Sequence, residues 1–451
     1  MATVVLAGIA AAASAAAAAG TGLFFATLFS VTGLTAFAVG AGLSLISRAL
    51  APKLNLSAQM GGRSVMTREA AHSRKIVYGR ARIGGNVVYL ESSGTDNKYL
   101  WLVTAIAAHE IDAYEEVWFN DEKVWDGGNF TAAWKSPDTA STSPYVDIGF
   151  YKGDQTSADN ASQRGAASLV SNSTKWTDNH KLLDTAYMVV KLTHDVDKFA
   201  QGLPNISTVI RGKKVLDPSD NSTAWSQNPA LCIYDYLRDT KYGLGESAAN
   251  ILTSSVTTAK GVCDEAVSLA AGGTQPRYTI DGVVDTASSI KSNIETMTGS
   301  MIGRLIYSGG KFEIHAGEYV APTITIDESM AVGEITVQTK QSRRNAFNGV
   351  KGVFVSEDDN YVVADYPAQQ SKTTAGNFEV TSPPSVRYKI LEIGSTDFTL
   401  IGAASNTVGL DFTATGAGTG DGVASLFLAQ DGEPIYLDMA LPFTINNIRA
   451  Q

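Results

Sequence analysis

The sequence predicts a mainly β fold with some α-helix, divided among several domains and preceded by hydrophobic N-terminal helices. The first observation is length, because 451 residues exceed what one compact core usually holds. The second is composition: 44% of the residues are hydrophobic and 18% are charged, which is enough apolar material for packed domains. The third is pattern, because short runs of β-branched and aromatic residues bounded by turn residues recur through most of the chain after residue 72.

Residues 1–50 are the compositional outlier, and we expect them to form a hydrophobic helical segment. No charged residue occurs from Ala2 to Ser47, and this stretch could supply two membrane spans of about 20 residues each. A secretory signal fits poorly, because the apolar run is too long and no positive residue precedes it. Three interpretations stay open: a transmembrane hairpin, a helical core buried in an assembly, or a segment sequestered in a particle and later released into a membrane. We favour the last two, because Ala and Gly suit close helix packing between copies of the chain.

Residues 51–71 form a predicted linker, and residues 72–215 a predicted β-rich domain. We expect one hairpin over Lys75–Tyr89 that turns at Gly84–Gly85, and a second over Glu115–Trp125 that turns at Asn120–Asp121. Further strands are expected over residues 99–106, 186–192 and 207–215. Residues 126–184 are rich in Ser, Thr, Asn, Asp and Gly, so we interpret this polar excursion as surface decoration with short elements of its own.

Residues 216–318 are expected to form an α+β domain. Its clearest signal is a helix with Asn228 as N-cap and Pro229 in the first turn, followed past its end by Gly243 as an expected left-handed cap. Further helices are expected over residues 257–270 and 287–299, and a hairpin around Gly309–Gly310. The turn-rich, alternating sequence that follows predicts a β domain over 319–370, a small Gly-rich β module over 371–430, and a return to the preceding domain over 431–451.

The chemistry-bearing residues form no catalytic or metal-binding pattern. His109–Glu110 lacks the second histidine of a zinc-protease motif, because residue 113 is alanine. The five histidines lack metal-ligand spacing, and the sequence contains no nucleophile elbow or phosphate loop. The acidic stretches 194–197 and 357–359 are interpreted as solvated turns rather than calcium loops. We therefore expect no enzymatic activity, no cofactor and no bound metal.

Charge and cysteine content narrow the class of protein further. A net charge of -10 argues against a surface that grips nucleic acid, which would need clustered Lys and Arg. The two cysteines, Cys232 and Cys263, lie in helical-looking stretches and outside any CxxC pair. We expect both to be buried thiols, since a secreted disulfide scaffold would contain many more cysteines.

Residues 204–245 carry the most specific pattern in the chain. The stretch PNISTVIRGKKVLDPSDNSTAWSQNPALCIYDYLRDTKYGLG combines a strand ending in a basic turn, an AWSxNPAL helix start and a YGLG end. It resembles the central signature of the tip attachment (host-specificity) proteins of lambda-like long-tailed bacteriophages. The matching signature residues are Arg211, Gly212, Trp225, Asn228, Pro229, Tyr242, Gly243 and Gly245.

The resemblance covers most of residues 72–370 and then changes. Further matches lie at residues 78–85, 107–122, 341–355 and 365–370. In the resembled proteins an LPFT sequence follows the last of these closely, whereas here it comes only within residues 431–444. We therefore interpret the module of residues 371–430 as an insertion, similar to a small module of other phage structural proteins. The resembled proteins also continue past the position that matches Gln451, which leaves open whether this chain contacts the receptor itself.

The resemblance implies a baseplate-hub architecture at the tail tip of a virion. It implies a homotrimer around the tail axis that closes the tail tube and opens for transient passage of DNA. The implied partners are other tail-tip and tail-tube proteins, the tape-measure protein, and fibre or receptor-binding proteins. We hypothesise that residues 2–47 plug the lumen or contact the tape-measure protein, and then contact the host membrane at ejection. The main alternative is a membrane-anchored β-domain binding protein; a tail-associated lysin would need a carboxylate pair that sequence does not reveal.

Overall fold

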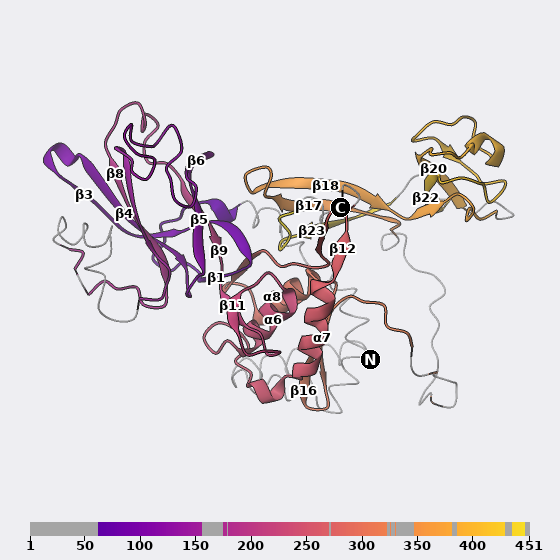
Figure 1. The fold of residues 1–451 in the computed structure, drawn as a ribbon, viewed down its shortest axis with the longest axis horizontal. Coiled ribbons are helices and arrows are strands. Elements are labelled where there is room, and N and C mark those ends of the chain that lie inside the picture. Colours follow the sequence, from indigo (N-terminus) through magenta and orange to yellow (C-terminus); the bar gives the residue numbers. More distant parts are fainter. Residues whose placement is uncertain are drawn as a thin grey trace, which may run out of the picture. The chain divides into compact units, whose positions relative to one another are not determined.

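The computed structural model describes residues 62–155, 175–177, 179–269, 272–322, 325, 330, 347–380, 386–428 and 435–446. Within these residues the predicted mainly β architecture is confirmed, with several small sheets and three α-helices (Figure 1). The predicted hydrophobic helices of residues 1–50 and most of the predicted linker lie outside the described residues. Two short 3-10 helices, Gly62–Ser64 and Thr95–Asn97, belong to the first part of the described chain.

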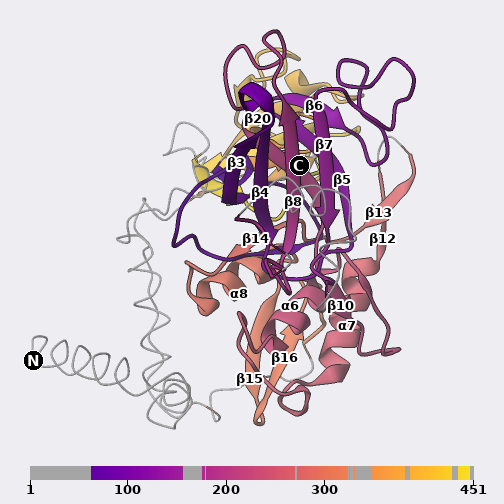
Figure 2. The ribbon, with the colours of Figure 1, turned by 90° about the vertical axis from the view of Figure 1, so that its left-hand side faces the viewer.

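Two four-stranded antiparallel sheets enclose the first core. One has the order β2-β9-β5-β6 and comprises β2 (Arg80–Gly84), β9 (Ile206–Arg211), β5 (Ala113–Phe119) and β6 (Glu122–Trp125). The other has the order β3-β4-β8-β7 and comprises β3 (Asn86–Ser93), β4 (Tyr99–Ala107), β8 (Ala186–Thr193) and β7 (Val146–Tyr151) (Figure 2). Buried side chains from both sheets, such as Ile83, Leu102 and Val117, form what we call the β core. The predicted hairpin at Asn120–Asp121 and the strands over 99–106 and 186–192 are confirmed.

The predicted hairpin at Gly84–Gly85 is wrong. Three strands cover this stretch, and each joins a different sheet: β1 (Lys75–Tyr78) pairs with β14 (Gly282–Asp285), β2 with β9, and β3 with β4. The two glycines serve close packing instead of a turn. A Cβ atom at Gly84 would lie 2.4 Å from the carbonyl oxygen of Val65, and one at Gly85 would lie 2.3 Å from the Thr104 side chain. Glycine is the only residue that tolerates such approaches.

The polar excursion of residues 126–184 is more than surface decoration. Its strand β7 pairs with β8 along six residues and completes one of the two sheets. Phe130 and Trp134 are 8% and 4% exposed and belong to the β core. A few buried aromatic side chains are enough to pack this segment onto the β core despite its low aliphatic content, because each one buries a large apolar area.

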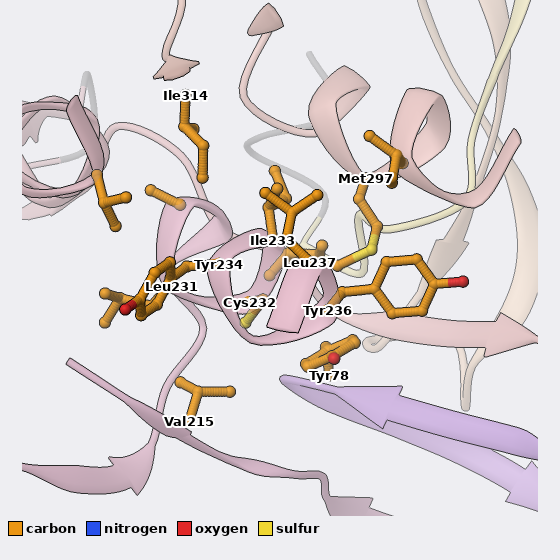
Figure 3. Close-up of a cluster of buried hydrophobic side chains, with 14 of the residues drawn as sticks. Tyr78, Val215, Leu231, Cys232, Ile233, Tyr234, Tyr236, Leu237, Met297 and Ile314 are labelled. Carbon is orange, nitrogen blue, oxygen red and sulfur yellow. The ribbon is translucent and has the colours of Figure 1, made fainter. Parts of the chain in front are cut away.

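A second core, which we call the helical core, surrounds α6 (Pro229–Arg238) (Figure 3). Its other helices are α7 (Thr253–Asp264), α8 (Ile290–Gly299) and the 3-10 turn Ala248–Asn250. Helix α7 overlaps the predicted range of 257–270, but it begins at Thr253 and ends at Asp264, because residues 266–268 form a strand. Helix α8 begins at Ile290, later than the predicted residue 287. Its N-cap is Ser289, whose side chain accepts a hydrogen bond from Ser292 N. Both cysteines are buried free thiols, as predicted.

Three two-stranded ladders accompany the helical core. They are β10 (Lys214–Leu216) with β11 (Thr223–Trp225), β12 (Ala266–Ser268) with β13 (Thr274–Pro276), and β15 (Arg304–Ser308) with β16 (Lys311–His315). The hairpin predicted at Gly309–Gly310 is confirmed, and both glycines have positive φ. The strand predicted over 207–215 is instead two strands, β9 and β10, interrupted at Gly212.

The C-terminal part of the described chain contains two sheets. In the order β18-β17-β23, the strands β18 (Val362–Gln370) and β17 (Gly349–Ser356) are antiparallel, and β23 (Tyr436–Leu441) runs parallel to β17. The other has the order β19-β22-β20-β21, with β19 (Lys372–Thr374), β22 (Val423–Leu428), β20 (Val386–Glu392), β21 (Asp411–Phe412) and the 3-10 helix Phe398–Ile401. This second sheet encloses its own core, whose buried residues all lie between Ala375 and Ala424. The strands that begin and end this module in sequence, β19 and β22, pair with each other, and Leu426 N donates to Ser371 O over 3.2 Å.

We predict that residues 371–430 fold as an isolated fragment. The fragment retains its complete hydrophobic cluster, including Tyr388, Phe398 and Phe412, and its ends are joined by strand pairing. Expressed alone, it should unfold in one cooperative transition, measured by thermal circular dichroism. A matched Phe398→Ala variant should unfold at a clearly lower temperature, because it loses roughly 3 kcal/mol or more of core packing. A featureless melt of the unmodified fragment would contradict the prediction.

Candidate functional site

The signature segment lies where the two cores meet. Strand β1 borders both, because Ile76 and Tyr78 belong to the helical core whereas Val77 belongs to the β core. Gly79 ends β1 with a φ of +63°, a conformation that favours glycine, and a Cβ atom there would lie 2.0 Å from Ile280 O. Residues around this point are called the signature junction below: Tyr78, Gly79, Arg80, Arg211, Gly212, Lys213 and Trp225.

Gly212 crosses β1 at close range. A Cβ atom at Gly212 would lie 2.1 Å from the carbonyl oxygen of Val77. The Gly212 N–H donates to Gly79 O over 2.8 Å, and the Lys213 N–H donates to Val77 O over 2.8 Å. Gly79 O also accepts a 3.0 Å hydrogen bond from Trp225 Nε1. Gly212 and Trp225 of the predicted signature therefore meet at Gly79 O. Gly79 itself lies in another matching stretch, residues 78–85.

Arg211 completes an ion-pair network on the β2-β9-β5 sheet. Its guanidinium lies 2.6 Å from Asp112 and 3.8 Å from Glu115, and its Cζ is 5.3 Å from the centre of the Trp225 ring. Glu115 is shared with Arg80, which also contacts Glu357 in the turn between β17 and β18. The network thus joins three segments that are far apart in the chain. Each of these charged side chains is at least a quarter exposed, so we assign the network an orienting role more than a large stabilising one.

Lys213 links the junction to α6. Its ammonium lies 2.7 Å from Asp235 and 2.8 Å from Asp239, and Asp235 also accepts a hydrogen bond from the Tyr78 hydroxyl at 2.7 Å. Burial would lower the pKa of Lys213, but the two carboxylates raise it above its ordinary value. Burial would raise the pKa of Asp239, but the hydrogen bond and charge of Lys213 lower it. The lysine is therefore held charged between helix and strand.

Asn228 and Pro229 start α6 as predicted. The Asn228 side-chain oxygen accepts hydrogen bonds from Ala230 N at 3.0 Å and Leu231 N at 3.4 Å, and Pro229 occupies the first helical turn. The side-chain nitrogen of Asn228 donates to Lys260 O at 3.1 Å and to Asp264 Oδ1 at 2.8 Å. Asn228 therefore caps α6 and also ties α6 to the C-terminal turn of α7. The sequence predicts the cap but not the contact with α7.

The predicted left-handed cap at Gly243 is wrong. Helix α6 ends at Arg238, its C-cap Asp239 has extended backbone angles, and the positive φ of +76° belongs to Gly245. Gly243 is needed for another reason, because a Cβ atom there would lie 1.9 Å from Tyr236 O. Tyr242 packs partly buried against the helical core, and its N–H donates to Asp239 Oδ1 at 3.0 Å. The YGLG end thus folds the chain back over the last turn of α6.

His109 is a buried residue beside the junction, and the sequence does not predict its contact with β1. The sequence suggests His109 only as half of an incomplete zinc motif, whereas its Nε2 accepts a 2.9 Å hydrogen bond from Val77 N, the neighbour of Tyr78 in β1. Its Nδ1 lies 2.7 Å from Glu110 O. Burial lowers the pKa of His109 to about 4, so the ring is neutral at pH 7. No local pattern signals this contact, because the two residues lie in different strands and loops.

The junction is built from contacts between protein groups. Among the described residues, no group of three or more His, Cys, Asp or Glu side chains is placed to hold a metal ion. None of the helices in the described part of the chain is long and apolar enough to cross a membrane. All eight signature residues are described in the structure, and three of them, Arg211, Gly212 and Trp225, lie in the signature junction.

Two curated proteins resemble the chain, although no family model matches its sequence. "Baseplate hub protein pb3" of Escherichia phage T5 is 22% identical over 345 residues, which covers 63% of this chain and 36% of that protein. "Tip attachment protein J" of Escherichia phage SECphi27 is 25% identical over 219 residues, which covers 42% of this chain and 18% of that protein. The predicted resemblance is confirmed. The chain is a structural protein of the phage tail tip, and its location is the virion.

The chain spans about a third or less of the length of these two relatives. Among solved structures, a chain of the virion of a native gene transfer agent particle aligns with a TM-score of 0.41 and 12% sequence identity, over 75% of this chain and 76% of that chain.

Replacing Lys213 with methionine should destabilise this tail-tip protein by about 2 kcal/mol. The variant keeps the length of the side chain but leaves Asp235 and Asp239 without their shared cation in a mostly buried site. Urea unfolding followed by tryptophan fluorescence would measure the loss. The matched control is Lys241→Met, because Lys241 is exposed and lies 3.9 Å from an exposed Asp184. Equal unfolding midpoints for the two variants would show that the buried pair contributes nothing.

His109 should make the protein sensitive to acid. Its folded pKa of about 4 lies below the unfolded value of 6.5, so its contribution is complete above pH 6.5 and is lost as the pH falls toward 4. The loss amounts to roughly 3 kcal/mol. In His109→Gln, whose amide oxygen can still accept from Val77 N, the free energy of unfolding should fall less over this range. The exposed His194→Gln variant is the control, and identical pH profiles for all three proteins would refute the assignment.

Proposed function

We propose that this chain is the central hub of a siphophage tail tip. In this role three copies surround the tail axis, close the distal end of the tail tube, scaffold fibre or receptor-binding proteins, and open for genome ejection. The observation that carries the proposal is the signature junction, whose residues match the tip-attachment signature and also join the two main cores. The two relatives, a baseplate hub protein and a tip attachment protein, support the same role.

The proposed role is structural rather than enzymatic. The basic side chains of the junction pair with acidic side chains beside it: Arg80 and Arg211 with Glu115 and Asp112, and Lys213 with Asp235 and Asp239. A net charge of -10 suits a hub through which DNA passes, because a negative surface repels the phosphate backbone and leaves it free to slide. No cofactor or metal is part of the proposal.

We assign the uncharged N-terminal sequence to the axis of the trimer. Residues 2–47 contain no charged side chain, so three copies would gather apolar sequence that water disfavours. In the proposal this sequence closes the lumen or contacts the tape-measure protein, and contacts the host membrane at ejection. The inserted module of residues 371–430 and the polar excursion of residues 126–184 are the proposed contacts for neighbouring tail-tip proteins.

The second candidate function is a membrane-anchored β-domain binding protein. The same uncharged stretch of residues 2–47 favours it, because the stretch could supply two spans of about 20 residues. The two functions differ in assembly. A hub should give a particle-bound trimer by mass measurement, whereas an anchored binding protein should give a monomer that needs detergent to stay in solution.

Deleting residues 2–47 tests the hub function in the phage. We expect virions that assemble with the shortened hub but lose DNA prematurely or fail to eject it, because the lumen lacks its closure. Electron microscopy counts full and empty heads, and a potassium-release assay on host cells reports membrane opening. The control is the Lys241→Met variant, which changes an exposed side chain outside the deleted stretch, and its virions should retain and eject their DNA normally. Shortened virions that retain DNA and infect at the normal rate would overturn the assignment of this segment.

A further inference from the structure

A small polar pocket lies beside the turn between β17 and β18. Its volume is about 20 Å³, which is room for one water molecule, since a bound water needs at least about 10–15 Å³ of such space. Five of its lining side chains are polar: Arg63, Ser64, Arg82, Asp281 and Tyr361. A pocket with polar walls suits water, whereas apolar cavities of proteins stay dry. We call this site the turn pocket.

The Tyr361 side chain brings a buried hydroxyl group to the turn pocket. Tyr361 is 8% exposed, and its ring packs with Trp118 and Val209. Among the described residues, no protein group forms a hydrogen bond with the Tyr361 hydroxyl. Burial raises the pKa of Tyr361, so the hydroxyl keeps its proton and can donate a hydrogen bond. A buried tyrosine hydroxyl usually has such a partner, because leaving it without one is costly.

Arg82 forms a fixed part of the pocket wall. Each of its three guanidinium nitrogens donates to a protein oxygen, namely Ser207 Oγ at 2.9 Å, Asn360 O at 2.9 Å and Asn120 O at 2.6 Å. The bond to Asn360 O holds the residue next to Tyr361. The hydrogen bonds of Arg82 therefore keep the turn, and with it the Tyr361 ring, against β2.

Arg63 and Asp281 supply the other charged groups of the turn pocket. Arg63 Nη1 donates to Pro442 O at 2.8 Å, and burial lowers the pKa of Arg63 to about 10, so it stays charged at pH 7. Asp281 is 2% exposed, and its Oδ1 accepts from Arg80 N at 2.8 Å and from Gln227 Nε2 at 2.6 Å. A guanidinium has five N–H donors and a carboxylate about four acceptor positions, so both groups can bind a water besides these partners.

The two signs of charge decide which molecule fits. An anion would be repelled by the Asp281 carboxylate, and a cation by the Arg63 guanidinium. Water is dipolar, so it can accept from one group and donate to the other. The volume leads to the same conclusion, because it admits one water and no larger ligand.

We propose that the turn pocket binds one ordered water molecule, held by the Tyr361 hydroxyl, the Arg63 guanidinium and the Asp281 carboxylate. Three hydrogen bonds are typical of a buried water. This water joins three stretches of the chain that are far apart in sequence, and it gives the Tyr361 hydroxyl its partner. The site lies within a single chain, so the proposal goes beyond the hub function and does not depend on it.

Removing the Tyr361 hydroxyl tests the proposal by the sign of the effect. In the full-length chain, Tyr361→Phe should lower the folding equilibrium constant by roughly threefold to tenfold, because the water loses one hydrogen bond. Urea unfolding followed by tryptophan fluorescence measures this constant, and Trp118 lies beside the altered ring. If the hydroxyl had no partner, Tyr361→Phe would leave the constant unchanged or raise it, and that result would overturn the proposal.

Two other tyrosines calibrate this measurement. Tyr366→Phe removes a direct 3.0 Å hydrogen bond to Met439 O, so its loss should be similar to that of Tyr361→Phe. Tyr319 is 86% exposed, so Tyr319→Phe should leave the folding constant unchanged.

A crystal structure of the full-length chain identifies the occupant. We expect one electron-density peak in the turn pocket, within hydrogen-bonding distance of Tyr361 Oη. Crystals soaked in bromide should show no anomalous signal at this position, because water does not exchange for a halide. A pocket without a density peak, or one that takes up bromide, would contradict the assignment of a water.

Discussion

The approach of Gly212 to β1 is the constraint on which the rest of the structure depends. At Gly79 the backbone turns through a positive φ between β1 and β2, and a Cβ atom at Gly212 would lie 2.1 Å from Val77 O. These two positions let a single strand border both the β core and the helical core. Any side chain at either position would push the two cores apart, because each obstructing atom is backbone that other hydrogen bonds hold in place.

The ion pairs around this crossing extend its order to a third part of the chain. Arg80 contacts Glu357, and Arg82 donates to Asn360 O at 2.9 Å, so two neighbouring residues of β2 hold the turn between β17 and β18. That turn is strained, since Asn360 and Tyr361 have φ of 59° and 61° without being glycine. The Tyr361 ring packs with Trp118 and Val209 of the β2-β9-β5 sheet, which offsets the strain through burial.

The predictions that held depend on neighbours in sequence. Asn228 caps its helix through the next three residues, and Gly309–Gly310 turns a hairpin between adjacent strands, so local pattern suffices. The predictions that failed depend on distant residues. Position 84 must be glycine because the Val65 carbonyl lies too close for a Cβ atom. Helix α7 stops because the residues that follow it, β12, pair with β13. The buried His109 ring accepts a hydrogen bond from Val77 N, which is distant in sequence. The resemblance identifies the signature residues, but it does not predict that Gly212 and Trp225 both contact the segment of β1 and Gly79.

This arrangement separates what marks the protein from what it offers to partners. The polar groups of Gly79, Gly212 and Lys213 form hydrogen bonds or ion pairs with one another, with β1 and with α6. Few of these groups remain for contacts with a second protein. A tail-tip protein must nevertheless present surfaces to its neighbours, and uncharged apolar side chains in water are the costly feature that such contacts relieve. Among the described residues, exposed apolar side chains lie at many places away from the junction, for example Val196, Ile302, Tyr319 and Leu400. In the proposed hub, such exposed apolar side chains would supply the contacts with neighbouring proteins, whereas the crossing requires glycine at Gly79 and Gly212.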